Sequence, residues 1–165
     1  MFLTKKARFI LAAAETHFDQ VIYTLQQKKL LQPRHTGVYM TIFEEWDREI
    51  IPVASFMLGD QPSRDRRSEI TQNALEKAQR LHRHPAHISS WVSRDPQRKC
   101  YGGAIRAIAT HETESSRLII SSSGFPEHGD EALNLLTGRE LGWYSPIGEI
   151  IAASDNQLAR ELLAL

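Results

Sequence analysis

The segment over residues 117–143 constrains the fold most, because it predicts a buried strand, a tight turn and an amphipathic helix in direct succession. A short apolar run at residues 118–120 has the composition of a buried strand, and three serines followed by Gly124 end it. Glycine adopts backbone angles that other residues avoid, and Pro126 holds the φ value that a first helical turn needs. The segment is a strand–turn–helix corner, which by itself does not identify a function.

The helix after this turn has acidic residues at its beginning and an apolar stripe along its length. Carboxylates near the first turn are favoured by the unpaired backbone N–H groups and by the positive end of the helix dipole. The stripe has the spacing of a core-facing helix surface, and Gly142 is a natural stop. We expect the backbone amides at the Gly124 bend to face a cavity. The acidic residues are Glu127, Asp130 and Glu131, and the stripe comprises Ala132, Leu135, Leu136 and Leu141.

The earlier part of the chain predicts a helix, a strand pair, a second helix and a further strand. Apolar residues at three- and four-residue steps predict helices over residues 4–31 and 64–82, and we place Lys77 and Arg80 on the exposed face of the second helix. Runs of β-branched and aromatic residues predict strands, and the acid-rich residues 44–49 predict an exposed turn. The predicted strands cover residues 37–43, 50–58 and 104–110, and a connection at 111–116 leads to the strand at 118–120.

Two other regions are less regular. Residues 86–100 are rich in polar and turn-forming types and predict a loop. Residues 147–153 fit a helical turn and a short strand equally well. Ser154 and Gln157 have the spacing of a capping box, which predicts a final helix over residues 155–163.

These elements together predict an α+β fold in which helices flank a central antiparallel sheet, because strand pairs joined by short connections form antiparallel hairpins. A chain of 165 residues without repeats or linkers predicts a single domain over residues 1–165.

Twenty basic residues balance twenty acidic ones, so we expect no nucleic-acid partner. No apolar run approaches the roughly 20 residues of a membrane span, and the single cysteine, Cys100, suits a reducing compartment. We therefore expect a cytoplasmic protein without a membrane partner.

Three histidines, His82, His84 and His87, form the densest group of potential metal ligands. In a helix the first two would point about 200° apart, given 3.6 residues per turn. Pro85 interrupts the turn before the third, and no cysteine pair or acidic motif of zinc spacing accompanies the group. A cationic helix end explains these residues more simply than a metal site does.

Other candidates for chemistry are weaker. Cys100 lies beside Arg98 and Lys99, and basic neighbours can make a thiol nucleophilic, although an incidental thiol is the simpler interpretation. The sequence has no phosphate-binding loop, dinucleotide fingerprint, nucleophile elbow or metalloprotease motif. These absences disfavour a standard enzyme without excluding one.

Two segments, GGAIRA at residues 102–107 and SSSGFPEHGDEALNLLTGRELG at residues 121–142, resemble the GlcG/HbpS-like family, which includes the C-terminal domain of PduO-type proteins. The order of the predicted elements is also similar to that of the family. The resemblance covers mainly residues 102–142. The segment TIFEEWDREI replaces the family's usual "VVD-x-x-G" pattern at the first hairpin.

The resemblance implies a profilin-like sandwich that assembles into homo-oligomers and binds a small molecule, with haem as a candidate cofactor and without established catalysis. The ligand-binding residues that it implies are His17 on the first helix and Ser123, Gly124, Glu127 and His128 at the turn. Each also has a plainer interpretation. His17 fits the boundary of the apolar stripe, His128 fits an exposed first helical turn, and Glu127 fits a helix start.

Three hypotheses for function remain open from the sequence. The first is an oligomeric domain that binds a small ligand, with haem as the example. The second is a small enzyme with a pocket at the Gly124 turn, where Glu127, His128 or Cys100 would act as acid, base or nucleophile. The third is a scaffold that serves only protein association.

Overall fold

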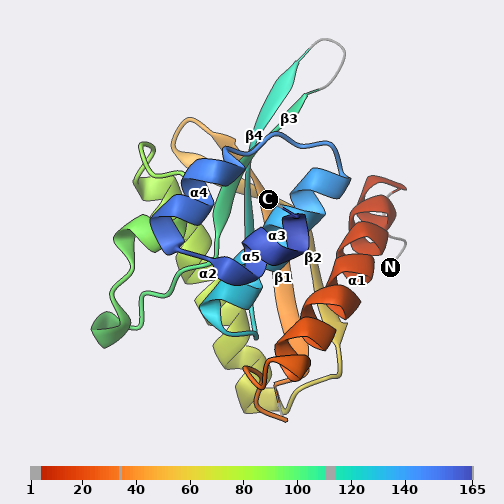
Figure 1. Cartoon of the computed structure of the whole chain (residues 1–165). Coiled ribbons are helices and arrows are strands. Elements are labelled where there is room, and N and C mark those ends of the chain that lie inside the picture. The colour runs from red at the N-terminus through yellow and green to blue at the C-terminus, as the bar shows by residue number, and fades with distance from the viewer. Residues whose placement is uncertain (1–4, 34, 111–113, 165) are drawn as a thin grey trace.

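Two antiparallel hairpins build the sheet in the computed structural model, which describes residues 5–33, 35–110 and 114–164. Strand β1 (Gly37–Trp46) pairs with β2 (Glu49–Gly59), and β3 (Ile105–Thr110) pairs with β4 (Ser115–Ser123). The hairpins join through β1 and β4, so the strand order is β2-β1-β4-β3 and every pairing is antiparallel (Figure 1). The predicted central antiparallel sheet is confirmed.

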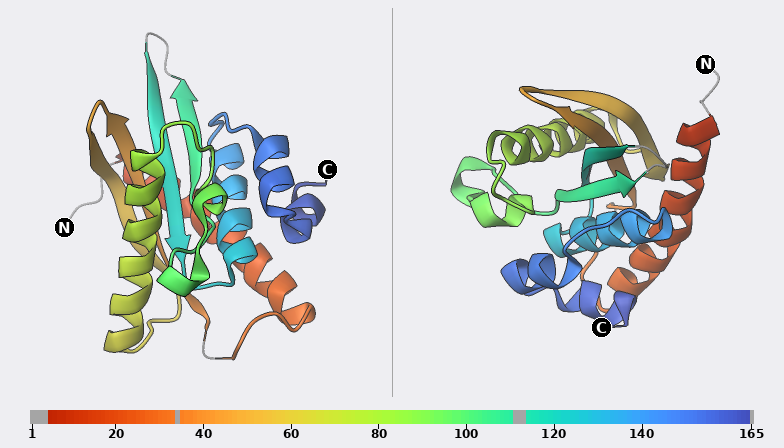
Figure 2. Two further views of the ribbon diagram at one scale, coloured as in Figure 1. Left: turned by 90° about the vertical axis from the view of Figure 1, so that its left-hand side faces the viewer. Right: turned by 90° about the horizontal axis from the view of Figure 1, so that it is seen from above.

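Helices cover both faces of this sheet, as the α+β prediction requires. Helix α2 (Arg64–Arg83) packs on one face against β1 and β4. Helices α1 (Lys5–Gln27) and α3 (Glu127–Glu140) cover the other face, and α5 (Gln157–Leu163) packs on α3, next to α4 (Ile147–Ser154). The two views of Figure 2 show the sheet between α2 on one side and α1 and α3 on the other.

The core follows the alternation of side chains along the strands. On the face covered by α1 and α3, Ile120 belongs to the large apolar cluster that also includes residues of α4 and α5. Ile119 points the opposite way and joins the smaller cluster under α2, with Phe43, Ala78 and Leu81. Both helical layers also bury polar side chains, which are Lys77 and Arg80 on α2 and Asp130, Glu131, Asn134 and Thr137 on α3.

The exposed turn predicted at residues 44–49 is wrong for residues 44–46, which continue β1, and for Glu49, which begins β2. Glu45 explains the difference, because its side chain is 7% exposed and its carboxylate accepts hydrogen bonds from Arg106 and His82. A charged residue can lie within a half-buried strand when neighbouring cations compensate it. Only Asp47 and Arg48 form the turn, and Asp47 has a positive φ of 32°.

The regions whose sequence pattern is irregular contain short helices. Residues 86–100 contain two short 3₁₀ helices, Ser90–Ser93 and Pro96–Arg98, within the predicted loop. Residues 147–153 are helical, within α4. The last helix is capped by Asn156, whose side chain accepts a hydrogen bond from the Ala159 amide, while Ser154 is the last residue of α4. The predicted capping box at Ser154 is therefore wrong, although the helix that it predicts is present.

The long first helix ends at Gln27, before the predicted end at residue 31, since Lys29 has a positive φ of 56°. Thr4, at which the predicted helix begins, and residues 111–113 of the predicted connection lie outside the described residues. Ser115 and Ser116, also assigned to that connection, belong to β4. Within the described ranges, no helix combines the length and the apolar character needed to cross a membrane.

Candidate functional site

The Gly124 turn brings the end of β4 to the beginning of α3, as the sequence predicts. Gly124 has a φ of +145°, and an added Cβ would lie 2.3 Å from the carbonyl oxygen of Gly37. The first amide after it does not face an empty cavity, because the Phe125 N–H donates to Asp130 Oδ1 at 3.1 Å. The helix that follows the turn thus satisfies the Phe125 amide with its own side chain.

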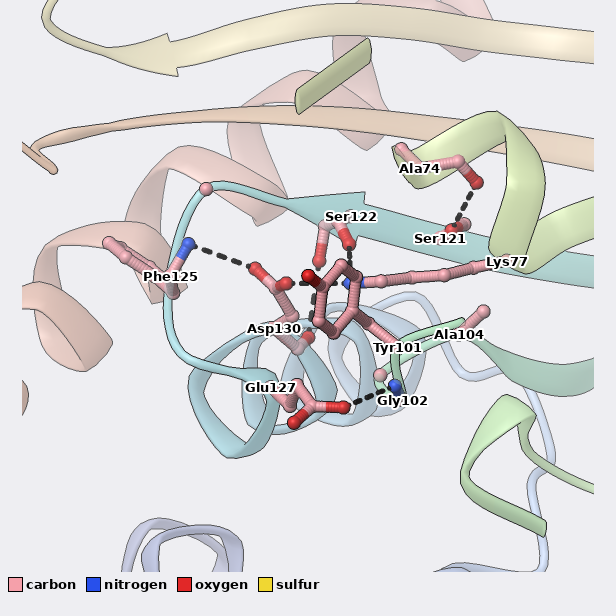
Figure 3. Close-up of polar contacts among 12 residues, drawn as sticks. Ala74, Lys77, Tyr101, Gly102, Ala104, Ser121, Ser122, Phe125, Glu127 and Asp130 are labelled. Carbon is pink, nitrogen blue, oxygen red and sulfur yellow. Dashed lines mark hydrogen bonds and ion pairs between the residues drawn. The ribbon is translucent and has the colours of Figure 1, made fainter. Parts of the chain in front are cut away.

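A buried ion pair lies directly behind this turn. Lys77, on α2, donates from Nζ to Asp130 Oδ2 at 2.8 Å and to the carbonyl oxygen of Ser122 at 2.9 Å (Figure 3). The side chains of Lys77 and Asp130 are each 2% exposed. Burial raises the pKa of the Asp130 carboxyl to about 6, and the attraction of Lys77 and the hydrogen bonds from Lys77 and the Phe125 amide only partly oppose this increase.

The sheet leaves room for Lys77 because β3 is shorter than β4. The pairing of β3 with β4 begins at Ile105, opposite Ile120, so β3 does not cover the last three residues of β4. Gly103, which precedes β3, has a φ of +115°, and its carbonyl oxygen accepts a hydrogen bond from Asn134 on α3. The Ser122 carbonyl lies beyond the end of β3 and accepts a hydrogen bond from the Lys77 amine. Because the same amine also donates to Asp130, Lys77 links α2 to α3 across the sheet.

We call the cavity at this point the turn pocket. It has a volume of about 270 Å³, and its lining includes Arg66, Lys77, Tyr101, Ser123, Glu127 and Asp130. Figure 3 shows the Tyr101 ring, the Lys77 amine and the Asp130 carboxylate in one region between α2 and α3. The pocket therefore combines a basic amine, carboxylates, a phenol and a guanidinium in a small volume.

Glu127 lies between the turn pocket and a second cavity. Its carboxylate accepts two hydrogen bonds from Arg94, at 2.8 and 2.7 Å, and one from the Gly102 amide at 2.6 Å. Burial alone would raise the pKa of the Glu127 carboxyl, but the hydrogen bonds from Arg94 and Gly102 outweigh burial and hold this pKa below its ordinary value. Glu127 is thus a fixed anion rather than a proton donor near neutral pH.

We call the second cavity the aromatic cleft. It has a volume of about 480 Å³ and lies where the end of α1, the 3₁₀ helix at Ser90–Ser93, the beginning of α3 and helix α5 meet. The rings of Trp91 and His128 stack with centroids 4.7 Å apart, and the Arg94 guanidinium lies 5.0 Å from the Trp91 ring centroid. Most of the exposed surface of the cleft is apolar, and the remaining lining comprises Leu25, Leu30, Pro126, Gly129 and Leu158 together with the polar residues Lys28, Asp155, Gln157 and Glu161.

The orientation of His128 follows from its hydrogen bond. Its Nε2 lies 3.0 Å from the carbonyl oxygen of Ser154, and since a carbonyl only accepts, Nε2 carries the proton. A neutral His128 ring then has its lone pair on Nδ1. Glu131, one turn further along α3, is buried and accepts hydrogen bonds from Ser154 and Asn156. Burial raises the pKa of the Glu131 carboxyl, and these two hydrogen bonds oppose the increase.

The structure brings together four of the five residues implied by the family resemblance. Ser123, Gly124 and Glu127 line the turn pocket, and Glu127 and His128 line the aromatic cleft. His17 lies elsewhere, with Nε2 3.7 Å from Glu140 at the far end of α3. The 14 residues of α3 separate the two positions by about 20 Å at 1.5 Å per residue.

The sequence pattern predicts Lys77 and Arg80 on the exposed face of α2, and this prediction is wrong, because both side chains are buried. Lys77 is 2% and Arg80 6% exposed, and Arg80 donates to the carbonyl oxygens of Ser90 and Ser93. The sequence does contain a pattern that indicates burial of Lys77, because Lys77 lies three residues after Ala74 and four before Leu81, within the apolar stripe. Trp91 and Arg94 had no such signal, since the loop that contains them has no periodicity.

The other residues considered from the sequence lie outside both cavities. His82 donates to Glu45, and the rings of His84 and His87 stack 4.9 Å apart. Within the part of the chain that the structure describes, no group of three or more His, Cys, Asp or Glu side chains is arranged to hold a metal ion. Cys100 is partly exposed, with Sγ 3.7 Å from the carbonyl oxygen of Arg98.

Comparisons with known proteins supply no relative: no family model, no curated protein and no solved structure matches this chain.

Proposed function

We propose that this chain is a small-ligand-binding domain and that its ligand occupies the aromatic cleft. The observation that supports this most is the stacked pair of Trp91 and His128 in the wall of a largely apolar cavity of about 480 Å³. Ligand pockets typically have roughly 300–1,000 Å³, apolar walls and a few polar groups that orient the ligand. The cleft meets each of these conditions.

The lining favours a planar ligand with an apolar body and a polar edge. The Trp91 and His128 rings offer flat surface. Two ion pairs add charged groups to the lining of the cleft, Arg94 with Glu127 and Lys28 with Glu161. The Nδ1 lone pair of His128 adds an acceptor or a metal ligand. Haem is the candidate named by the family resemblance, and its iron accepts an imidazole ligand.

Absorbance titration of the purified chain with haem tests this proposal. We expect a shift of the Soret band on binding, weakened by Trp91→Ala and by His128→Ala. Trp46→Ala and His84→Ala are matched controls, because both side chains are exposed and neither lines the cleft. If the control variants lose binding as much as the cleft variants, the site assignment fails. If no shift occurs, haem is not the ligand.

The titration also distinguishes the two candidate histidines. His17→Ala is expected to leave the Soret shift unchanged, since His17 lies at the far end of α3. Loss of the shift in His17→Ala with retention in His128→Ala would move the ligand site away from the cleft.

We further propose that the chain is a GlcG/HbpS-like, profilin-like domain that forms homo-oligomers. The element order and the segments at residues 102–107 and 121–142 support the family, and the family resemblance supports self-association. Light scattering of the purified chain at high micromolar concentration tests the second part. A mass of two or more chains is expected, and a strict monomer would contradict it.

A further inference from the structure

The turn pocket presents an amine that a bound molecule can contact. Lys77 lines this pocket, and two of the three N–H groups at its Nζ donate to Ser122 and Asp130. Gly103 approaches this amine without a side chain, since a Cβ added there would lie 3.4 Å from Nζ, in van der Waals contact with it. The third N–H group of Lys77 has no hydrogen-bond partner among the described residues, which leaves one position at the nitrogen for a molecule in the pocket.

Asp130 gives this amine an internal proton acceptor. Its Oδ2 lies 2.8 Å from Nζ, within the distance needed for direct proton transfer. The pKa of the Asp130 carboxyl, raised by burial to about 6, suits a group that takes up and returns a proton near neutral pH. A lysine that passes its proton to such a partner becomes a neutral nucleophile.

The remaining lining indicates the class of molecule. A volume of about 270 Å³ admits only a small compound. Arg66 lines the same pocket, where it donates to Glu69 at 2.9 Å, and a guanidinium has further N–H groups in the same plane that can bind a second carboxylate. Tyr101 adds a phenol hydroxyl that can donate to a carbonyl oxygen. A molecule that places a carbonyl carbon at Lys77 and a carboxylate at Arg66 must carry the two groups close together. A small 2-oxo acid has this structure.

We propose that Lys77 forms a Schiff base with a small 2-oxo acid in the turn pocket, with Asp130 as the proton carrier. Lys77 first passes a proton from its ammonium group to Asp130. The amine nitrogen attacks the carbonyl carbon, a C–N bond forms, and a proton moves from nitrogen to oxygen to give a carbinolamine. Asp130 returns its proton to the hydroxyl group, the C–O bond breaks and water leaves.

This reaction is balanced within the site. The ammonium and the ketone give a protonated imine and one water, and Asp130 ends as the carboxylate that it was at the start. No oxidant, reductant or metal is required. The proposal gives the enzyme hypothesis a specific form, and it does not depend on a ligand in the aromatic cleft.

Reductive trapping tests the proposal on the intact chain. Cyanoborohydride converts an imine to a stable secondary amine, so incubation with pyruvate near neutral pH should add one reduced adduct per chain. Digestion and mass spectrometry should place it on Lys77. Adducts spread over exposed lysines, with none on Lys77, would overturn the proposal without any variant being made.

Variants separate the proposal from a purely structural ion pair. Lys77→Arg keeps a cation beside Asp130 but has no amine that forms an imine, so the mapped adduct should be lost. Lys29→Arg, at an exposed lysine, should leave it unchanged. An adduct that persists at full yield in Lys77→Arg contradicts the assignment.

The carboxylate preference has its own test. Acetone is a neutral ketone similar in size to pyruvate, and we expect it to be trapped at Lys77 less efficiently. Arg66→Gln should lower trapping of pyruvate while leaving that of acetone unchanged, and equal yields with both ketones would rule out the oxo-acid class. Trp91→Ala should change neither yield, so failure of the aromatic cleft as a ligand site and failure of this proposal remain distinguishable.

Discussion

Gly124 is held in its conformation by both its own backbone and its neighbours. Its φ of +145° suits glycine alone, and a Cβ would lie 2.3 Å from the Gly37 carbonyl oxygen and 2.8 Å from the Val38 Cα. We expect Gly124→Ala to lower the free energy of unfolding by about 2–4 kcal/mol, since strain and backbone overlap add. Urea denaturation measures this change.

Gly148 provides the matched control for Gly124. It lies in the first turn of α4, where an added Cβ would meet no described atom within 4 Å. Gly148→Ala should change the free energy of unfolding by less than about 1 kcal/mol, in the stabilising direction. Equal losses in the two variants would mean that the backbone at Gly124 is not strained.

Asp130 makes the free energy of unfolding decrease as the pH rises, which is opposite to the usual effect of a carboxylate. Its pKa is raised from 3.8 to about 6 by burial, so the folded chain binds this proton more tightly than the unfolded chain does. The stabilisation from protonation is complete below pH 3.8 and is lost as the pH rises through about 6. The unfolding free energy of the wild type should therefore fall relative to that of Asp130→Asn across this window.

Urea denaturation at a series of pH values measures this difference between the wild type and Asp130→Asn. Asp19→Asn is the control, because it removes the same formal charge from an exposed position and should not reproduce the trend. A difference that is constant from pH 3.8 to 6 would show that Asp130 is not perturbed.

At the scale of elements, Asn156 connects α5 to α3. Its Oδ1 accepts from the Ala159 amide at 2.9 Å, and its Nδ2 donates to the His128 carbonyl and to Glu131. Loss of a helix cap costs about 0.5–2 kcal/mol, and here one buried acceptor, on Glu131, and one partly buried acceptor, the His128 carbonyl, also lose a donor. We expect Asn156→Ala to cost at least about 2 kcal/mol in unfolding free energy.

Thermal and urea unfolding of Asn156→Ala should be compared with Gln157→Ala. Gln157 is exposed and donates only to the neighbouring Asp155 among the described residues, so its replacement should stay within about 0.5 kcal/mol. If the two variants are equally stable, the cap assignment is wrong.

The elements that the sequence predicted correctly are those whose local signals agree with their packing. The Gly124 corner is an example, because the strand composition, the glycine and the helix-start acids all point to the same geometry. The cap of α5 could not be separated from Ser154 by spacing alone, since serine and asparagine both favour that position. Residues 44–46 were predicted wrongly for another reason: the side chains that donate hydrogen bonds to Glu45, His82 on α2 and Arg106 on β3, are distant in sequence.

At the scale of the whole molecule, the Lys77–Asp130 pair joins the two helical layers across the sheet. Removal of one partner of a buried ion pair leaves an uncompensated charge and costs about 3–5 kcal/mol, whereas apolar replacement of both is often neutral. We expect Lys77→Met alone to be strongly destabilising and the double variant Lys77→Met with Asp130→Leu to recover most of the loss. A double-mutant cycle by urea denaturation measures the coupling.

Additive losses in that cycle would contradict a direct link between the layers. The exposed pair Arg98 and Asp95 serves as the reference, since its side chains are 84% and 45% exposed and surface pairs contribute about 0–1 kcal/mol. A coupling energy for Lys77 and Asp130 no larger than that of the reference pair would show that burial adds nothing.

The candidate site shows why sequence predicts folds better than cavities. Ser123, Gly124, Glu127 and His128 are contiguous, and their grouping at one turn follows from the local pattern. The other walls come from distant parts of the chain, with Lys77 on α2, Trp91 and Arg94 in the loop after it, and the end of α1. Only tertiary packing brings these segments together, so their contributions could not be predicted from local periodicity.

Glu127 lines both cavities, so its charge acts on groups in each of them. It holds Arg94 in the aromatic cleft, and its negative charge also contributes to the raised pKa of Asp130 behind the turn. A cleft ligand that draws the Arg94 guanidinium away leaves this negative charge less neutralised, which raises the pKa of the Asp130 carboxyl further. Occupancy of the cleft by such a ligand would therefore raise the proton affinity of Asp130 through charge alone, without any displacement of the backbone.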